Sequence, residues 1–280
     1  MGALDGRVAL VAGASRGIGR GCALELAAAG AVVYGLGRTL REGEASLPGS
    51  LETTAREARE LGGVVVPVVC DLRRDADLAA AFARVDEEQG RLDVLVNSAF
   101  DLPEGCGNGV PFYATPISYW DDMLGIGARA AYAATWFAAQ RMLPRGAGLV
   151  ANVSSQGARE YFVHATYGIA KSALDRITRD VGRDLAPRGI AVVSLWPSYA
   201  RTERILAFDA EEWGVDLEGS ESPRFAGRGV VALAADPDLS KRAGRIFTTR
   251  QLADAYGFRD VDGALPKGAP DPETYYPPGP

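Results

Sequence analysis

The first forty residues alternate between a short apolar run, a glycine-rich turn and a helical pattern. An apolar run over 7–12 is typical of a strand buried on both faces of a parallel sheet. A turn with three glycines covers 13–19, and a helical pattern continues over 21–29. This alternation recurs along the chain and predicts an α/β protein: a doubly wound parallel sheet of about seven strands with helices on both faces.

The same reasoning assigns the rest of the chain. We expect further strands, all buried, over 31–37, 64–70, 92–96, 148–153, 190–196 and 244–248. We expect helices over 51–61, 77–89, 119–143, 167–185, 225–235 and 250–256. The irregular stretch 100–118 is interpreted as a mobile cover or substrate wall, and the polar stretch 202–224 as a lid. No repeat or linker interrupts the body, so we predict one domain over 1–265 and a proline-rich, extended tail over 266–280.

The glycine-rich turn has a specific chemical use in this setting. Glycines permit a tight turn and a close approach of the backbone to a pyrophosphate, and the following helix offers N–H groups and its positive dipole end. Such a turn alone is a weak signal, but a strand before it and a helix after it favour dinucleotide binding over a purely structural turn.

Two arginines indicate which dinucleotide is bound. Folds that prefer NAD place an acidic residue near the end of the second strand, where it binds the ribose 2′-hydroxyl. Arg38 stands there instead, and Arg16 lies within the glycine-rich turn. Guanidinium groups suit a 2′-phosphate, so the pair favours NADP. The alternative is that both are solvated surface side chains.

A tyrosine and a lysine lie four residues apart at the head of a predicted helix. Tyr167 and Lys171 share a helix face, and a nearby ammonium favours the phenolate and lowers the pKa of the phenol. The pair is therefore a candidate general acid and base. The alternative is a core tyrosine followed by a surface lysine. Lysine occurs only at 171, 241 and 267 in this arginine-rich chain, which indicates that an ammonium is needed at 171.

Composition excludes several classes of function. The net charge is −6 without a basic cluster, which argues against a nucleic-acid partner. No apolar run reaches the roughly 18 residues of a membrane span, and the N-terminus lacks the shape of a signal peptide, so a cytoplasmic protein is expected. Three separated cysteines and one histidine, His164, cannot assemble a zinc motif, so no metal is expected.

Five motifs together resemble the short-chain dehydrogenase/reductase family over roughly residues 5–250. They are Gly13-x-x-x-Gly17-x-Gly19, Asn97-Ser98-Ala99, Asn152-Val153-Ser154-Ser155, Tyr167-x-x-x-Lys171 and Pro197-x-x-x-x-Thr202. The resemblance implies a Rossmann fold. It also implies hydride transfer between NADP(H) and a ketone, an aldehyde or a secondary alcohol.

The resemblance also implies residue roles. Tyr167 would be the general acid or base, and Lys171 would lower its pKa and bind the nicotinamide ribose. A serine would polarise the substrate carbonyl. Its place in the motif indicates Ser155, whereas the usual thirteen-residue spacing before the tyrosine indicates Ser154. We favour Ser155 because the strand end fixes its position.

A larger set of residues would bind the cofactor. Asp71 and Leu72 would flank the adenine, Asn97 and Ala99 would line the adenosine side, and Thr202 would hold the carboxamide. The full set is Gly13, Ser15, Arg16, Gly17, Ile18, Gly19, Arg38, Asp71, Leu72, Asn97, Ala99, Tyr167, Lys171, Pro197 and Thr202. His164 would be part of a loop or of the substrate wall.

Three positions depart from the family pattern. Phe100 replaces a glycine near the nicotinamide, and Ser198 follows Pro197 where glycine is usual. Gly127 occupies the place of an asparagine that belongs to a proton relay in many members, and a water could fill the space it leaves.

The substrate and the assembly are predicted only by class. An uncharged, moderately apolar carbonyl compound is expected, because the presumed walls over 100–119 and 202–224 carry aromatic residues. A homodimer or homotetramer is expected through the helices of Tyr119 and Tyr167, whose small residues would permit close packing. The alternative functions are a non-catalytic NADP(H)-binding sensor or scaffold, and an epimerase or lyase that uses nicotinamide transiently.

Overall fold

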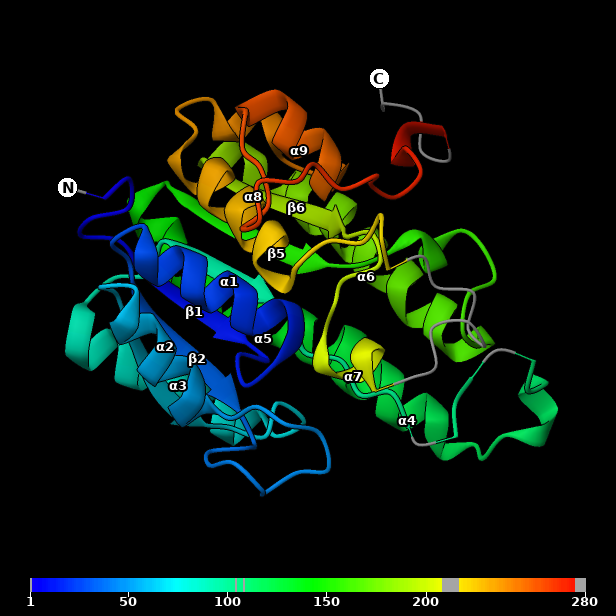
Figure 1. The fold of residues 1–280 in the computed structure, drawn as a ribbon. Coiled ribbons are helices and arrows are strands. Elements are labelled where there is room, and N and C mark those ends of the chain that lie inside the picture. Colours follow the sequence, from blue (N-terminus) through cyan, green and yellow to red (C-terminus); the bar gives the residue numbers. More distant parts are fainter. Residues whose placement is uncertain (1, 104, 108, 208–216, 275–280) are drawn as a thin grey trace.

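A parallel sheet forms the centre of the protein (Figure 1). The computed structural model describes residues 2–103, 105–107, 109–207 and 217–274. Within them, seven strands lie in the order β3-β2-β1-β4-β5-β6-β7, and every neighbouring pair is parallel. The strands are β1 (Val8–Ala12), β2 (Val32–Gly37), β3 (Val64–Val69), β4 (Val94–Asn97), β5 (Gly148–Val153), β6 (Ile190–Trp196) and β7 (Ile246–Thr248). The predicted doubly wound α/β fold is confirmed.

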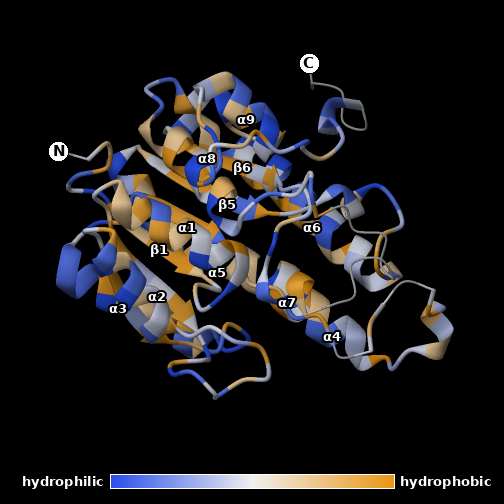
Figure 2. Ribbon diagram, in the orientation of Figure 1, coloured by the Kyte–Doolittle hydropathy of each residue, from blue (hydrophilic) through white to orange (hydrophobic). Residues whose placement is uncertain are grey.

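Helices cover both faces of the sheet. They are α1 (Gly17–Ala28), α2 (Leu51–Glu60), α3 (Asp75–Gln89), α4 (Ser118–Leu124), α5 (Ala130–Met142), α6 (Ala165–Leu185), α7 (Glu203–Leu206), α8 (Pro223–Ala235) and α9 (Thr249–Tyr256). One apolar core joins the sheet to α1, α2, α8 and α9, and a second joins it to α3 and α5 with the end of α6. Figure 2 shows hydrophobic residues along the central strands between these layers. Among the described residues, no helix has the length and apolarity to cross a bilayer.

The strand order places a crevice at the carboxyl ends of the central strands. β1 pairs with β2 on one side and with β4 on the other, so the chain reverses its winding direction between β1 and β4. The register aligns Ala12 with Asn97, and Asn97 with Asn152, which brings three strand ends to one edge. Crossovers that leave a sheet in opposite directions open a ligand crevice at that edge.

The third strand differs from its prediction as a buried strand. β3 is an edge strand, and its end residues Val64 and Val69 are 50% and 60% exposed. Pro67 lies in its interior, where an edge strand tolerates a residue without an N–H. A run of valines predicts a strand, but it does not specify the lateral place of that strand in the sheet.

The predicted long helix over 119–143 is interrupted. A π-helical turn, η2 (Gly125–Arg129), separates α4 from α5. Gly127 and Ala128 in this turn are buried inside the subunit. The small residues expected to pack against a second subunit included Gly127 and Ala128, and these two do not face outward.

The segments beyond β6 close over the crevice from one side. After β6 the chain forms a bridge between Ala200 and Glu221, and α7 begins the stretch predicted as a lid. Residues 208–216 of that stretch lie outside the described residues. Residues 266–274 are irregular and end in a 3₁₀ turn over Pro272–Thr274, and they contact the body, since Arg250 donates to the Pro266 carbonyl and Arg245 pairs with Glu273.

Candidate active site

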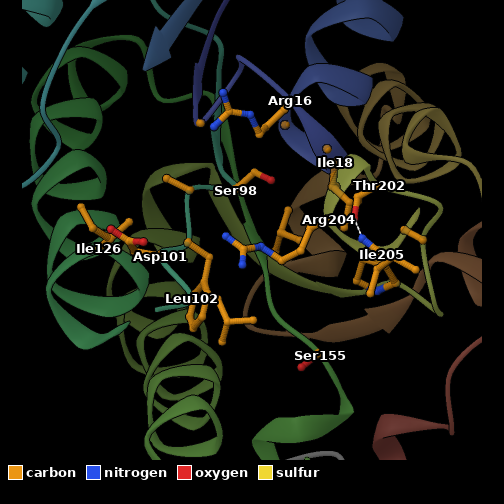
Figure 3. A pocket seen from close by; sticks show the side chains of 18 of the residues that line it. Arg16, Ile18, Ser98, Asp101, Leu102, Ile126, Ser155, Thr202, Arg204 and Ile205 are labelled. Atoms are coloured by element: carbon orange, nitrogen blue, oxygen red, sulfur yellow. Dashed lines mark hydrogen bonds between the residues drawn. The ribbon is translucent and has the colours of Figure 1, made fainter. Parts of the chain in front are cut away.

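A cavity of about 610 Å³ opens at the carboxyl edge of the sheet. Its size falls in the usual range for small-molecule and cofactor sites. Figure 3 shows side chains from the glycine-rich turn, from the strand ends and from the α7 segment converging on it. The predicted site residues on its wall are Gly13, Ser15, Arg16, Gly17, Ile18, Gly19, Arg38, Asp71, Leu72, Ala99, Ser155, Tyr167, Lys171, Pro197 and Thr202.

Asn97 is the predicted cofactor residue that does not line this cavity. Its side chain is buried, and its Nδ2 donates to Asn152 Oδ1 at 2.8 Å and to Thr135 Oγ1 at 3.2 Å. The amide therefore ties β4 to β5 and α5. Asn97 lies in β4 itself, whereas Ser98 and Ala99 follow the strand and reach the cavity.

The glycine-rich turn is shaped by close backbone contacts. Gly13 has φ of 88°, and a Cβ at this position would lie 2.7 Å from the Ala99 Cα. The turn leads into α1, whose first N–H, from Gly17, donates to Glu203 Oε2 at 2.8 Å. Arg20 binds the other Glu203 oxygen at 2.9 Å. The Glu203 carboxylate therefore already binds one N–H at the N-terminus of α1, where a negative charge is favoured.

The two arginines assigned to a 2′-phosphate differ in their surroundings. The Arg16 guanidinium donates to the Gly49 carbonyl at 2.9 Å and to the Pro48 carbonyl at 3.1 Å, so it anchors the loop before α2. The Arg38 side chain is 58% exposed, and its guanidinium lies 3.4 Å from Asp101. Arg38 is therefore the guanidinium that remains more available to a ligand.

Ser154 and Ser155, which follow β5, make different contacts. Ser155 Oγ lies 3.0 Å from Tyr167 Oη and accepts the Gly157 N–H at 3.2 Å. Ser154 Oγ faces away from the phenol and donates to the Lys171 carbonyl at 3.1 Å. Ser155 is thus the serine beside the candidate acid, as its place in the motif predicted.

Burial dominates the ionisation of the tyrosine and lysine pair. It raises the pKa of Tyr167 to about 12 and lowers the pKa of Lys171 to about 8, since the charged form of each is poorly solvated. The hydrogen bond from Ser155 acts in the opposite direction on the phenol. Burial thus shifts the pKa of Tyr167 upward, which is opposite to the lowering expected from Lys171.

The space beside Gly127 is filled by a side chain, in contrast to the expected water. A Cβ at Gly127 would meet the Phe100 ring at 2.6 and 2.8 Å. The same ring lies edge-on to Tyr167, with centroids 5.2 Å apart, and the Lys171 Nζ is 4.4 Å from its centroid. The two departures from the family pattern at 100 and 127 are therefore parts of one contact.

His164 caps a helix and is absent from the cavity wall. It is buried at the N-terminus of α6, where its Nδ1 accepts the Thr166 N–H at 3.2 Å. Its Nε2 lies 3.3 Å from Thr115 Oγ1. The preceding residue, Val163, lines the cavity with φ of 65°, an unfavourable conformation for a β-branched residue.

The loop after β6 is held by a buried carboxylate. The Ser198 N–H donates to Glu221 Oε2 at 3.0 Å, and Thr249 Oγ1 donates to the same oxygen. Burial raises the pKa of Glu221 to about 8. Thr202 caps α7 by accepting the Ile205 N–H, so its hydroxyl has a structural role as well as a place on the cavity wall.

Several wall residues were not predicted from sequence. Phe162 and Tyr199 add rings beside Tyr167, and Figure 3 shows Arg204 extending into the cavity. The other unpredicted wall residues include Ala45, Ser46, Leu47, Gln156, Gly268 and Ala269. The aromatic residues around the tyrosine were a usable signal, whereas nothing local marks the 45–47 loop or the tail. Within the described ranges, no group of three or more metal-binding side chains is present.

Comparisons with known proteins agree with this geometry. A family model described as short chain dehydrogenase matches residues 7–212. "Dehydrogenase/reductase SDR family member 1" of Mus musculus is 40% identical over 273 residues, covering 93% of this chain and 85% of that protein. "Short-chain reductase protein NovJ" of Streptomyces niveus is 30% identical, covering 88% and 84%.

The solved structures show the same fold. A short-chain type dehydrogenase/reductase from Mycobacterium marinum aligns with a TM-score of 0.75 at 24% identity, covering 88% of this chain and 94% of that one. The chain belongs to the short-chain dehydrogenase/reductase family, whose members are oxidoreductases that use nicotinamide cofactors.

Proposed function

We propose that the protein is an NADP(H)-dependent oxidoreductase that interconverts a ketone or aldehyde and the corresponding alcohol. The observation that carries this proposal is the 3.0 Å contact between Ser155 Oγ and Tyr167 Oη, in one cavity with Lys171 and the glycine-rich turn. Two hydroxyls that converge on one point can both donate to a single carbonyl oxygen. Tyr167 would then deliver the proton as the alkoxide forms.

The cavity wall fits a dinucleotide on its own features. A side chain at Gly13 would strike the Ala99 backbone, so only glycine allows this close turn before the N-terminus of α1, where an anion is favoured. Gly13 and Ile18 would hold the pyrophosphate, Thr202 would hold the carboxamide, and Asp71 and Leu72 would flank the adenine. The cofactor supplies the hydride when it is bound. Lys171 would bind the nicotinamide ribose and keep positive charge near the phenol.

Arg38 supports NADP as the preferred cofactor. It follows β2, lies on the cavity wall and carries more than half of its side chain in solvent. A 2′-phosphate would replace its long contact to Asp101 with charge-assisted hydrogen bonds. Arg16 would contribute through the loop that it anchors.

The walls near Tyr167 favour an uncharged, moderately apolar substrate. The rings of Phe100 and Phe162 lie 5.2 and 5.8 Å from the Tyr167 ring, and Tyr199 packs on Phe162. Aromatic faces bind apolar groups by excluding water, and a charged substrate would lose its hydration there.

The test is consumption of NADPH and of NADH with a panel of ketones and aldehydes, with Tyr167→Phe as the comparison. We expect turnover with NADPH, and a loss of about 10²–10⁴-fold in kcat in the variant with cofactor binding retained. A preference for NADH would overturn the cofactor assignment alone. Tight NADPH binding without turnover on the whole panel would contradict the enzyme and support the sensor or scaffold.

A further inference from the structure

We infer that Phe100 is a positioning residue that holds the Lys171 ammonium through the face of its ring. This inference rests on the proposed function, because it concerns the same tyrosine and lysine pair. It assigns to an aromatic side chain a task for which the resemblance had suggested a polar relay.

The contacts around the ammonium support this role. Lys171 Nζ donates one hydrogen bond to the Val153 carbonyl at 3.1 Å. It also lies 4.4 Å from the centroid of the Phe100 ring and 5.5 Å from that of the Tyr167 ring. A cation within about 6 Å of a ring centroid is attracted by the negative face of the ring, most strongly where water is excluded. Lys171 is 6% exposed, so this contact is poorly screened.

The charged and titratable groups around Lys171 do not neutralise it directly. Asp175 follows one helical turn later on α6, but its carboxylate accepts from Ser194 Oγ at 2.7 Å and from Trp196 Nε1 at 3.0 Å. Tyr167 is the other titratable group beside Lys171, Tyr199 lies near Tyr167, and both phenols are neutral at pH 7. Among the described residues, no carboxylate forms a salt bridge with Lys171. Asp175 acts on Lys171 through space and raises its pKa, whereas the ring face and the Val153 carbonyl contact the ammonium directly.

Gly127 makes this placement of the ring possible. Any side chain there would place a Cβ 2.6 Å from the Phe100 ring, so the glycine and the ring are needed together. The π-helical turn η2 carries Gly127 toward the site, and Ala170 lies on its other side. The Phe100 ring thus fills the space beside Gly127.

The experiment is a direct titration of the lysine by NMR. The chain has lysines only at 171, 241 and 267, so protein labelled with ¹³C at the lysine ε-carbons gives three signals. Lys241→Arg and Lys267→Arg identify two of them and leave Lys171 by elimination. Burial lowers the pKa of Lys171 to about 8, which places its titration within an accessible pH range.

We expect Phe100→Leu, which keeps the site apolar but removes the ring, to lower the pKa of Lys171 by about one unit. Gly127→Ala, which displaces the ring, is expected to lower it in the same direction. Phe100→Tyr keeps a ring and is expected to retain the wild-type value. Phe162→Leu is the matched control, since it removes a ring that packs on Tyr167 at 5.8 Å. It should leave the pKa of Lys171 unchanged.

An unchanged or raised pKa of Lys171 in both Phe100→Leu and Gly127→Ala would overturn the inference. An equal drop in Phe162→Leu would also overturn it, because the effect would then be general to the cavity. The titration needs neither substrate nor turnover. A protein that reduces no carbonyl compound would refute the proposed function and leave this measurement intact.

Discussion

At the scale of single residues, two adjacent serines provide a sharp comparison. Ser155 Oγ contacts Tyr167 Oη at 3.0 Å, whereas Ser154 Oγ is bound to the Lys171 carbonyl. We predict that Ser155→Ala lowers kcat by about 10²-fold, because one donor to the developing alkoxide is lost. Ser154→Ala should cost about 1 kcal/mol of stability with little change in kcat. Steady-state kinetics of both variants gives kcat, and urea unfolding gives the loss of stability. A larger loss of kcat in Ser154→Ala than in Ser155→Ala would assign the catalytic role to Ser154.

Arg38 and Arg16 both lie near the expected adenosine ribose, but their substitution should affect cofactor binding in different ways. Arg38→Gln removes a guanidinium that is free to bind a 2′-phosphate, and we expect NADPH to bind about 10–100-fold more weakly while NADH binding stays the same. Arg16→Gln removes the anchor of the 39–50 loop, so binding of both cofactors should weaken. Fluorescence titration of the two cofactors against each variant is the measurement. Equal weakening of NADPH and NADH by Arg38→Gln would argue against the 2′-phosphate contact.

Some features of the site could not be predicted from the sequence. The thirteen-residue spacing before Tyr167 indicates Ser154, whereas the place in the motif indicates Ser155. The two criteria differ because neither the strand nor the helix fixes the number of residues in the loop between them. The Phe100 and Gly127 contact joins positions 27 residues apart, and no local pattern predicts it. The resemblance placed Asn97 on the adenosine side, but its buried amide binds Asn152 and Thr135, and no local sequence pattern predicts these contacts.

At the scale of elements, the loop after β6 depends on the ionisation of Glu221. Its Oε2 accepts from Ser198 and Thr249, whereas Oε1 is buried without a partner among the described residues. Burial raises the pKa of this carboxyl to about 8, far above its value of roughly 4.3 in an unfolded chain. Between these values the folded state binds a proton that the unfolded state does not. The contribution of Glu221 to the free energy of unfolding is therefore greatest below about pH 4.3 and is lost as the pH rises toward 8.

We predict that Glu221→Gln removes this pH dependence. From pH 6 to pH 8, the free energy of unfolding of the wild type should fall by about 1–2 kcal/mol relative to the variant. Urea unfolding at the two pH values measures the difference. Glu60→Gln is the control, because that carboxylate is 68% exposed on α2 and should give the wild-type slope. Parallel pH curves for Glu221→Gln and the wild type would show that Glu221 is ionised in the folded protein at pH 6.

At the scale of the whole molecule, the alternation of apolar runs and helical patterns was sufficient to predict the architecture. Short apolar runs that alternate with helical patterns are typical of a parallel sheet with helices between the strands. The lateral order of strands follows from packing across the sheet, which explains why β3 was not recognised as an edge strand. The π-helical turn was likewise not predicted, and its Gly127 lies against the Phe100 ring, which comes from another part of the chain.

The last prediction concerns the assembly of subunits, which we expect to involve the outer faces of α5 and α6. Tyr132 and Trp136 lie one turn apart on α5, and each is 54% exposed, while Ile169 on α6 is 45% exposed. The opposite side of α5 is buried in the second core. Aromatic surface of this extent gains free energy when a second copy removes it from water, and two-fold contacts between identical subunits are the most common solution. We therefore expect a homodimer or homotetramer that uses these two helices.

Trp136→Glu should weaken that assembly, because a charge would have to be buried in the contact. Light scattering after size-exclusion chromatography should give a multiple of the monomer mass for the wild type and a smaller species for the variant. Tyr113→Glu is the control: its ring is 79% exposed on the turn before α4, and its substitution should leave the mass unchanged. A wild-type protein of monomer mass at micromolar concentration would refute the assembly. An oligomer that survives Trp136→Glu but dissociates in Tyr113→Glu would move the contact from α5 to the 112–114 turn.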